Sequence, residues 1–158
     1  MHWPGHVGLG VLAYLPLYLW LAAAESTTLA VIGLVVAVGA SMLPDVDIEL
    51  SIPHRGPTHT LWFVAIATVL ATVVGYALGI WIGRPGATAA LAIGGAMGLS
   101  LTSHVAVDAL TPMGIRPLEP LSSASISLRV VKSRNRFANR FLFATGGLSI
   151  LATIPLVI

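Results

Sequence analysis

Long apolar stretches separated by short polar segments make up most of the chain. A helix needs about 20 apolar residues to cross the hydrocarbon core of a membrane, and five stretches approach or reach that length. The pattern therefore predicts an all-α, polytopic membrane bundle of about five transmembrane helices. The predicted spans are residues 7–24, 28–43, 61–83, 87–110 and 140–158.

Composition supports the membrane class. Of the 158 residues, 56% are hydrophobic and 9% are charged, and the mean hydropathy is +0.92. A soluble protein carries about 25% charged residues. We expect a single membrane-embedded domain over residues 1–158. The chain has no cysteine, which excludes disulfides and thiolate metal ligands. Residues 1–6 lack the basic residues of a signal peptide, so we expect the first apolar stretch to be a span.

Basic residues are distributed unevenly between the two predicted sides of the membrane. Arg84 is the one basic residue on the side opposite the N-terminus. The side that holds the N-terminus collects Arg55, Arg116, Arg129, Lys132, Arg134, Arg136 and Arg140. Basic residues in short loops favour the cytoplasm, so the split predicts a cytoplasmic N-terminus and an external C-terminus.

Polar motifs with metal-binding chemistry all fall on that predicted cytoplasmic side. Ionisable residues are costly near hydrocarbon, so such a cluster indicates a functional site. Imidazole and carboxylate groups together suit a divalent transition metal. The candidate metal ligands are His6, Asp45, Asp47, His54, His59, His104 and Asp108.

The spacing within two of these motifs limits their geometry. His104 and Asp108 are four residues apart, which places them on one face of a helix. The alternative is a buried histidine hydrogen-bonded to a carboxylate. Asp45 and Asp47 follow Pro44. If the segment is extended, both aspartates can face a metal. If it forms a turn, one aspartate binds the metal and the other orients a metal-binding histidine. Asp45 is the better ligand candidate, and a free Asp47 is a candidate catalytic base.

The segment 54–60, His-Arg-Gly-Pro-Thr-His-Thr, precedes the third predicted span. We expect Thr58 to cap that helix, which would place His59 in its first turn. Arg55 can bind a phosphate or carboxylate through two parallel hydrogen bonds, or it can anchor the loop at the membrane surface. Arg116 is a second candidate for the substrate anion. His54 has a solvated loop position as its alternative, and we expect His2 to be solvated.

The order of these motifs resembles the YdjM-type family. The resemblance rests on His6, on Leu43-Pro44-Asp45-Val46-Asp47, on the segment 54–60, on Ser103 to Gly114 and on Pro117. It implies an inner-membrane-associated, metal-dependent hydrolase of a family also described as LexA-binding. Members often carry a glutamate before the last span. Residues 135–140 have none, and Asn139 is the candidate substitute.

A remoter resemblance is to the zinc-dependent phospholipase C fold. There His6, Asp45, His59, His104 and Asp108 would correspond to residues that hold a zinc cluster. That fold also has a His-x-x-x-Glu pair that this chain lacks, which implies fewer ions.

These features together predict a metal-dependent hydrolase of the cytoplasmic membrane, active on a phosphoester or another ester. One or two divalent ions, zinc before manganese or iron, would activate water. The expected partners are membrane lipids and a lipid-like or anionic substrate, and no nucleic acid. The alternatives are an ion or proton-coupled transporter, and a non-catalytic membrane regulator that uses residues 129–140.

Overall fold

The computed structural model describes residues 1–50 and 53–157, and Ile158 of the fifth predicted span lies outside them. Over the described residues the chain forms helices and no strand, which confirms the all-α prediction. One isolated β-bridge pairs Ile115 with Ile126. The helices are α1 (Trp3–Ala24), α2 (Thr27–Ala40), α3 (Val46–Glu49), the 3₁₀ helix η1 (Pro57–His59), α4 (Leu61–Trp81), α5 (Gly86–Ala109) and α6 (Arg136–Val157).

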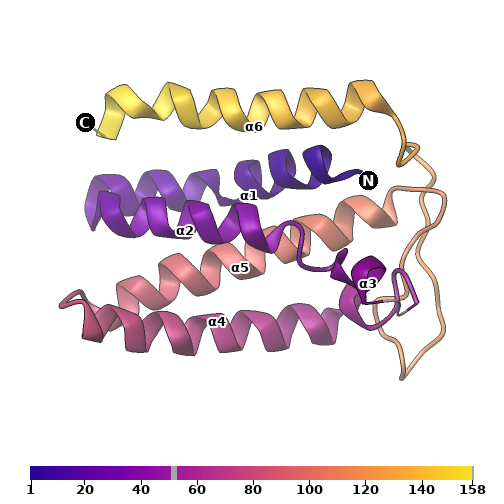
Figure 1. Cartoon of the computed structure of the whole chain (residues 1–158), viewed down its shortest axis with the longest axis horizontal. Coiled ribbons are helices and arrows are strands. Elements are labelled where there is room, and N and C mark those ends of the chain that lie inside the picture. The colour runs from indigo at the N-terminus through magenta and orange to yellow at the C-terminus, as the bar shows by residue number, and fades with distance from the viewer. Residues whose placement is uncertain (51–52, 158) are drawn as a thin grey trace.

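The five long helices lie side by side along one axis (Figure 1). Helices α1, α2 and α5 pack against one another at the centre, while α4 packs on α5 and α6 packs on α1. Successive long helices run in opposite directions. The N-terminus therefore lies at one end of the bundle and the end of α6 at the other (Figure 1).

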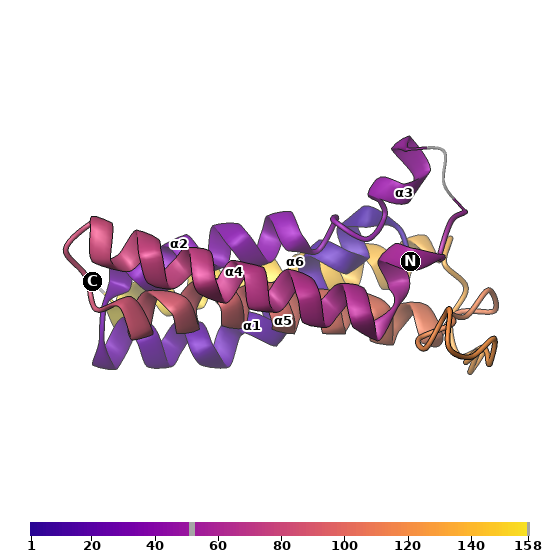
Figure 2. The same cartoon turned by 90° about the horizontal axis from the view of Figure 1, so that it is seen from below.

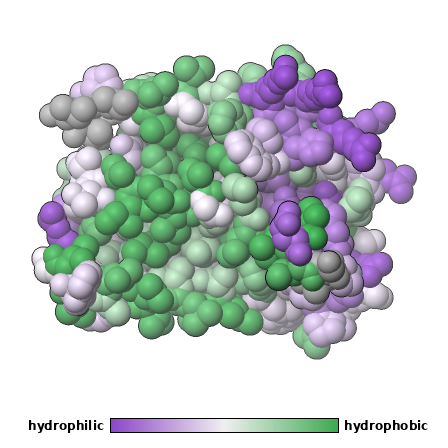
Figure 3. Space-filling model, in the orientation of Figure 1, coloured by the Kyte–Doolittle hydropathy of each residue, from purple (hydrophilic) through white to green (hydrophobic). Residues whose placement is uncertain are grey.

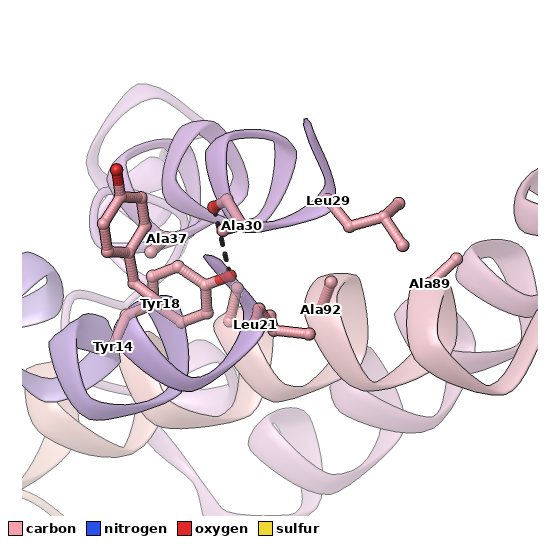
Figure 4. Close-up of a cluster of buried hydrophobic side chains, with 9 residues drawn as sticks. Tyr14, Tyr18, Leu21, Leu29, Ala30, Ala37, Ala89 and Ala92 are labelled. Carbon is pink, nitrogen blue, oxygen red and sulfur yellow. Dashed lines mark hydrogen bonds between the residues drawn. The ribbon is translucent and has the colours of Figure 1, made fainter. Parts of the chain in front are cut away.

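Tyrosine and small residues fill the centre of the bundle. Tyr14 is fully buried among side chains of α1, α2 and α5, and its hydroxyl donates to the carbonyl of Ala30 at 3.2 Å (Figure 4). The alanines Ala37, Ala89 and Ala92 line the same cluster. Small residues allow helix backbones to approach closely where lipid supplies no hydrophobic driving force for association.

Helices α1 and α6 meet at two glycines. A Cβ atom on Gly8 would lie 2.2 Å from the carbonyl oxygen of Leu142, and one on Gly146 would lie 2.7 Å from the carbonyl oxygen of Gly8. Neither backbone atom can move aside without moving its helix. The two glycines therefore set the distance between α1 and α6.

Within the described part of the chain, three helices, α1, α4 and α5, are long and apolar enough to cross a membrane. Helix α2 is apolar. The predicted span ended at residue 43, but the helix ends earlier, at Ala40. Its 14 residues cover about 21 Å at about 1.5 Å per residue, less than the hydrocarbon core of about 30 Å. The count of five spans stays a prediction.

Polar residues gather at the end of the bundle that holds the N-terminus. Figure 3 shows a wide hydrophobic band over the helices, with hydrophilic residues concentrated at this end. Residues 41–50, 53–60 and 110–135, which connect the long helices, lie there, and α3 stands off from the bundle (Figures 1 and 2). The predicted cap at Thr58 is wrong. Pro57 starts a 3₁₀ turn that runs through His59, and Thr60 caps α4 by accepting from the Phe63 amide at 3.2 Å.

Candidate metal centre

Four predicted ligands converge at the polar end of the bundle. Asp45 follows α2, His59 ends η1, and His104 and Asp108 lie in the last turns of α5. One ligand atom from each lies within 4.8 Å of those of the other three. His59, His104 and Asp108 are buried, and the side chain of Asp45 is 25% exposed. Residues far apart in the sequence therefore form one group that can hold a metal ion.

The separations of the donor atoms suit a small divalent ion. The Nε2 atoms of His59 and His104 are 3.3 Å apart. Asp45 Oδ1 lies 3.6 Å from the first and 3.5 Å from the second. Asp108 Oδ2 lies 3.5 Å and 3.8 Å from them. Ligands about 2.0–2.2 Å from a tetrahedral ion are about 3.3–3.6 Å apart, and four of these five separations lie in that range.

The other nitrogen of each histidine is held by the protein. His104 Nδ1 lies 2.7 Å from the carbonyl oxygen of Ser41, which only accepts, so Nδ1 donates and Nε2 keeps its lone pair. His59 Nδ1 lies 3.4 Å from Asp47 Oδ2. The Nε2 lone pairs of the two histidines and the carboxylates of Asp45 and Asp108 then face one point. The buried Oδ2 atom of Asp108 has no hydrogen-bond partner. A bound cation satisfies all four groups at once.

The electrostatics of the cluster also favour a cation. Burial alone would raise the pKa of Asp45, but its contacts with His104 and His59 outweigh burial and hold the pKa below its usual range. Burial lowers the pKa of His59, whereas Asp108 and Asp45 raise it, and the net shift is upward. The carboxylates therefore stay charged and attract positive charge to the point between the rings.

Asp47 lies behind His59 and is fully buried. It accepts from the backbone amide of Arg55 at 2.9 Å and from the Thr58 hydroxyl at 3.0 Å, and His54 Nδ1 lies 2.9 Å away. Burial would raise the pKa of Asp47, but these hydrogen bonds, led by that from His54, lower it. The geometry matches the alternative in which Asp45 faces the ion and Asp47 orients a histidine.

The Arg55 guanidinium is directed into the protein. Its NH2 group lies 2.9 Å from Asp108 Oδ1, and its NH1 group donates to Thr111 Oγ1 at 2.7 Å and to the Gly114 carbonyl at 2.9 Å. Arg55 is only 8% exposed, and its φ of 62° is unusual for a residue other than glycine. These contacts position the Asp108 carboxylate and tie α5 to the connection that follows it.

His6 approaches the cluster from α1. Its ring stacks on that of His104 with the centroids 3.6 Å apart. His6 Nε2 lies 3.6 Å from Asp108 Oδ1 and 4.0 Å from Asp45 Oδ2, the carboxylate oxygens that do not face His59. It also lies 3.0 Å from the carbonyl oxygen of Met1, whose amino group pairs with Asp108.

The remaining predicted residues lie outside the four-donor group. His54 is exposed beside Asp47, and Asp45, Asp47 and His54 form a second, looser group of possible ligands. Arg116 is exposed and pairs with Glu119 at 3.8 Å. Asn139 is buried at the start of α6, where it accepts from the His2 amide at 3.0 Å. The structure thus places Asn139 at the junction of α1 and α6.

A pocket of about 640 Å³ opens at the cluster, and its lining includes Asp45, His54 and Arg55. The group that can hold an ion is therefore accessible from outside the protein at Asp45.

Sequence reasoning did not identify Ser41 or Thr111 as part of this site. Ser41 contributes its backbone carbonyl, which is free because α2 has just ended. Thr111 accepts from Arg55 and donates to the carbonyl of Asp108 at 2.8 Å. The one signal for Ser41 was its place shortly before Pro44, where a helix must end.

Comparison with known proteins identifies a family. The family model described as YdjM inner membrane protein matches residues 1–157. No curated protein and no solved structure matches the chain. The remoter likeness to the zinc-dependent phospholipase C fold therefore has no support from these comparisons.

Proposed function

The chain belongs to the YdjM family of inner membrane proteins, and from this membership and the donor cluster we propose that it is a membrane-bound, metal-dependent hydrolase. The ion is held by Asp45, His59, His104 and Asp108. The substrate is a phosphoester or another ester that carries a negative charge.

The observation that carries the proposal is the place where the four donors meet. One of the four, Asp45, lines a pocket of about 640 Å³, and the other three are buried behind it. A site that only stabilises the fold usually has its ion enclosed by four protein ligands, whereas a catalytic site is open to water and substrate. Four protein donors alone would enclose the ion, so catalysis here requires a fifth position for water. The pocket beside the partly exposed Asp45 is the side on which that position would open.

A divalent ion at this site would polarise the ester and lower the pKa of water. Water attacks the phosphorus or carbonyl carbon, the bond to the leaving oxygen breaks, and the products are an acid and an alcohol. The water proton needs an acceptor at the pocket. His54 lines the pocket, and its Nδ1 is held by Asp47 at 2.9 Å. In this proposal His54 accepts the proton and returns it to the leaving oxygen, as carboxylate-oriented histidines do.

His6 is the candidate ligand for a second ion, because Asp45 and Asp108 each direct one oxygen toward the His59–His104 pair and the other toward His6. His6 Nε2 lies 3.0 Å from the carbonyl oxygen of Met1, and Asp108 Oδ1 pairs with Arg55. A second ion would have to displace both contacts before it could act with the first, as in two-metal hydrolytic sites. A set of imidazole and carboxylate donors without thiolate favours zinc, with manganese and iron as the other candidates.

We place the pocket at the cytoplasmic face of the inner membrane, with five helices crossing and the C-terminus external. The support is the basic residues gathered at the pocket end of the bundle, whereas the opposite end carries Arg84. Arg55 keeps its proposed role in binding the anion only if its guanidinium leaves Asp108. Arg116 is exposed and keeps its proposed role as a second cation for the anion.

The test is metal analysis of purified protein followed by a phosphoester and lipid ester screen. We expect at least one equivalent of zinc, manganese or iron, lost in the double variant His104→Ala/Asp108→Ala, and turnover that disappears with it. Arg84→Ala, at an exposed arginine at the opposite end of the bundle, is the control and should retain metal and turnover. Bound metal without turnover of any ester would reject the hydrolase in favour of a structural ion. Metal-driven flux into liposomes would favour a transporter.

A further inference from the structure

The pocket at the metal cluster has a lining of mixed chemistry. Asp45, His54 and Arg55 line it, together with other polar residues such as Glu49 and Arg134. A large apolar part of its wall comes from α1, from the connection after α2 and from α3, namely Trp3, Met42, Leu43, Val46 and Ile48. A small, soluble phosphoester gains no binding free energy from such a wall, because burying its polar groups against apolar side chains costs free energy.

The apolar wall belongs to the part of the protein that meets the edge of the membrane. Trp3 is 50% exposed at the first turn of α1, and tryptophan is enriched where headgroups meet hydrocarbon. Met42 and Ile48 are also exposed. The remaining length of α1 and α2 is apolar. The pocket therefore opens at the depth where the chain of a membrane lipid is within reach.

Gly39 extends the pocket along α2. A Cβ atom built on Gly39 would meet no atom within 4 Å, and Gly39 lines the pocket. Glycine inside a helix lowers helix stability compared with alanine. At Gly8, close packing against α6 requires glycine despite its lower helix stability. At Gly39 no neighbouring atom requires glycine, because the space around it is open. A side chain at this position would occupy the volume next to Met42 and Leu43.

The rim supplies charge for a headgroup. Arg134 lies on the rim with its side chain exposed. Glu49 also lies on the rim and repels an anion, so an anionic headgroup is drawn toward Arg134. Together with a divalent ion at Asp45, this arrangement suits a phosphate group.

We propose that this pocket binds a membrane amphiphile, with its phosphate between Asp45 and Arg134 and its hydrocarbon chain along Gly39. This rests on the proposed function for the ion at Asp45, and it names the substrate class of the same site. The lipid enters sideways from the membrane. Gly39 limits how much chain the pocket admits.

The test compares two phosphodiesters that differ in their chains, bis(p-nitrophenyl) phosphate and long-chain phosphatidylglycerol in mixed micelles. Gly39→Leu should lower kcat/KM for phosphatidylglycerol at least tenfold, with bound metal and turnover of the short ester unchanged. Gly147→Leu is the control, because a Cβ on Gly147 of α6 also meets no atom within 4 Å and this residue lies outside the pocket. Arg134→Gln should lower kcat/KM for both substrates alike, whereas Arg84→Gln, at the opposite end of the bundle, should lower it for neither.

Binding measured without turnover separates this inference from the hydrolase proposal. Native mass spectrometry of the metal-loaded protein should show saturable binding of phosphatidylglycerol, reduced at least tenfold by Gly39→Leu and retained in Gly147→Leu. If lipid binds in this way and no ester is cleaved, the hydrolase is wrong and the pocket assignment holds. Equal binding by Gly39→Leu and wild type, or equal loss of both esters in Gly39→Leu, overturns the pocket assignment. Turnover of the short ester alone assigns the site to a soluble substrate.

Discussion

Asp47 contacts two histidines that have different proposed tasks. Its Oδ2 atom lies 3.4 Å from His59 Nδ1, and its Oδ1 atom lies 2.9 Å from His54 Nδ1. A carboxylate behind a metal-binding histidine fixes the orientation of the ring and raises the affinity for the metal. The same carboxylate, buried and bound on both oxygens, has little access to substrate. Asp47 therefore fits the task of positioning both rings better than that of a base.

Substituting Asp47 tests this assignment. Asp47→Asn should weaken metal binding by about 10–100-fold, the usual effect of losing such a partner, because the amide no longer offers two anionic oxygens. Metal competition with a chromophoric chelator measures the change. His54→Ala should instead retain metal and lower kcat, since His54 lies outside the four-donor group. Glu25→Gln, at an exposed acid at the opposite end of the bundle, should change neither. Full metal affinity in Asp47→Asn would return Asp47 to the role of base.

The helices depend on close backbone contact as much as on apolar side chains. Helices α1 and α6 approach so closely at Gly8 that no side chain fits between them. This contact brings Asn139, at the start of α6, to the amide of His2, a few residues before His6. Packing of α6 on α1 therefore helps to hold the N-terminal segment over the metal cluster.

A single methyl group at this contact should be destabilising. Gly8→Ala should lower the free energy of unfolding by about 1–3 kcal/mol, the range for overpacking, because the added Cβ meets backbone atoms of α6. Thermal unfolding in detergent measures the change. Gly147→Ala, also within a helix but facing open space, should be neutral or stabilising by up to about 1 kcal/mol. Equal stability of Gly8→Ala and wild type would mean that α6 can move away from α1 without cost.

The bundle as a unit has one polar, basic end and an apolar band along its length (Figure 3). A chain that crosses the membrane an odd number of times has its termini on opposite sides, and the two termini lie at opposite ends of the bundle in Figure 1. Helix α2 is the hardest to reconcile with five spans, because its 14 residues are too few to cross the hydrocarbon core. Residues 41–45 would have to complete the crossing. Thinning of the bilayer or flanking polar residues accommodate such a helix.

Reporter fusions test this orientation. A reporter after residue 157 should read as external, and one inserted near Glu119, in the connection before α6, should read as cytoplasmic, because basic residues favour the cytoplasm. A reporter at Arg84 should also read as external. If the two ends of the chain lie on one side, one helix does not cross, and α2 is the first candidate.

The apolar pattern was enough to predict the helices, and the ionisable residues gave seven candidate ligands that include the four of the donor group. Each long apolar stretch became a helix within a few residues of its predicted ends, because helix period and length follow from local sequence. The pairing of His104 with Asp108 followed from spacing alone. Three-dimensional packing determined the rest. It assigned Asp45 and Asp47 to different positions, turned the Arg55 guanidinium inward, and moved the cap from Thr58 to Thr60. These outcomes depend on backbone carbonyls and amides such as those of Ser41, Arg55 and Gly114, which every residue carries and which no side-chain pattern reveals.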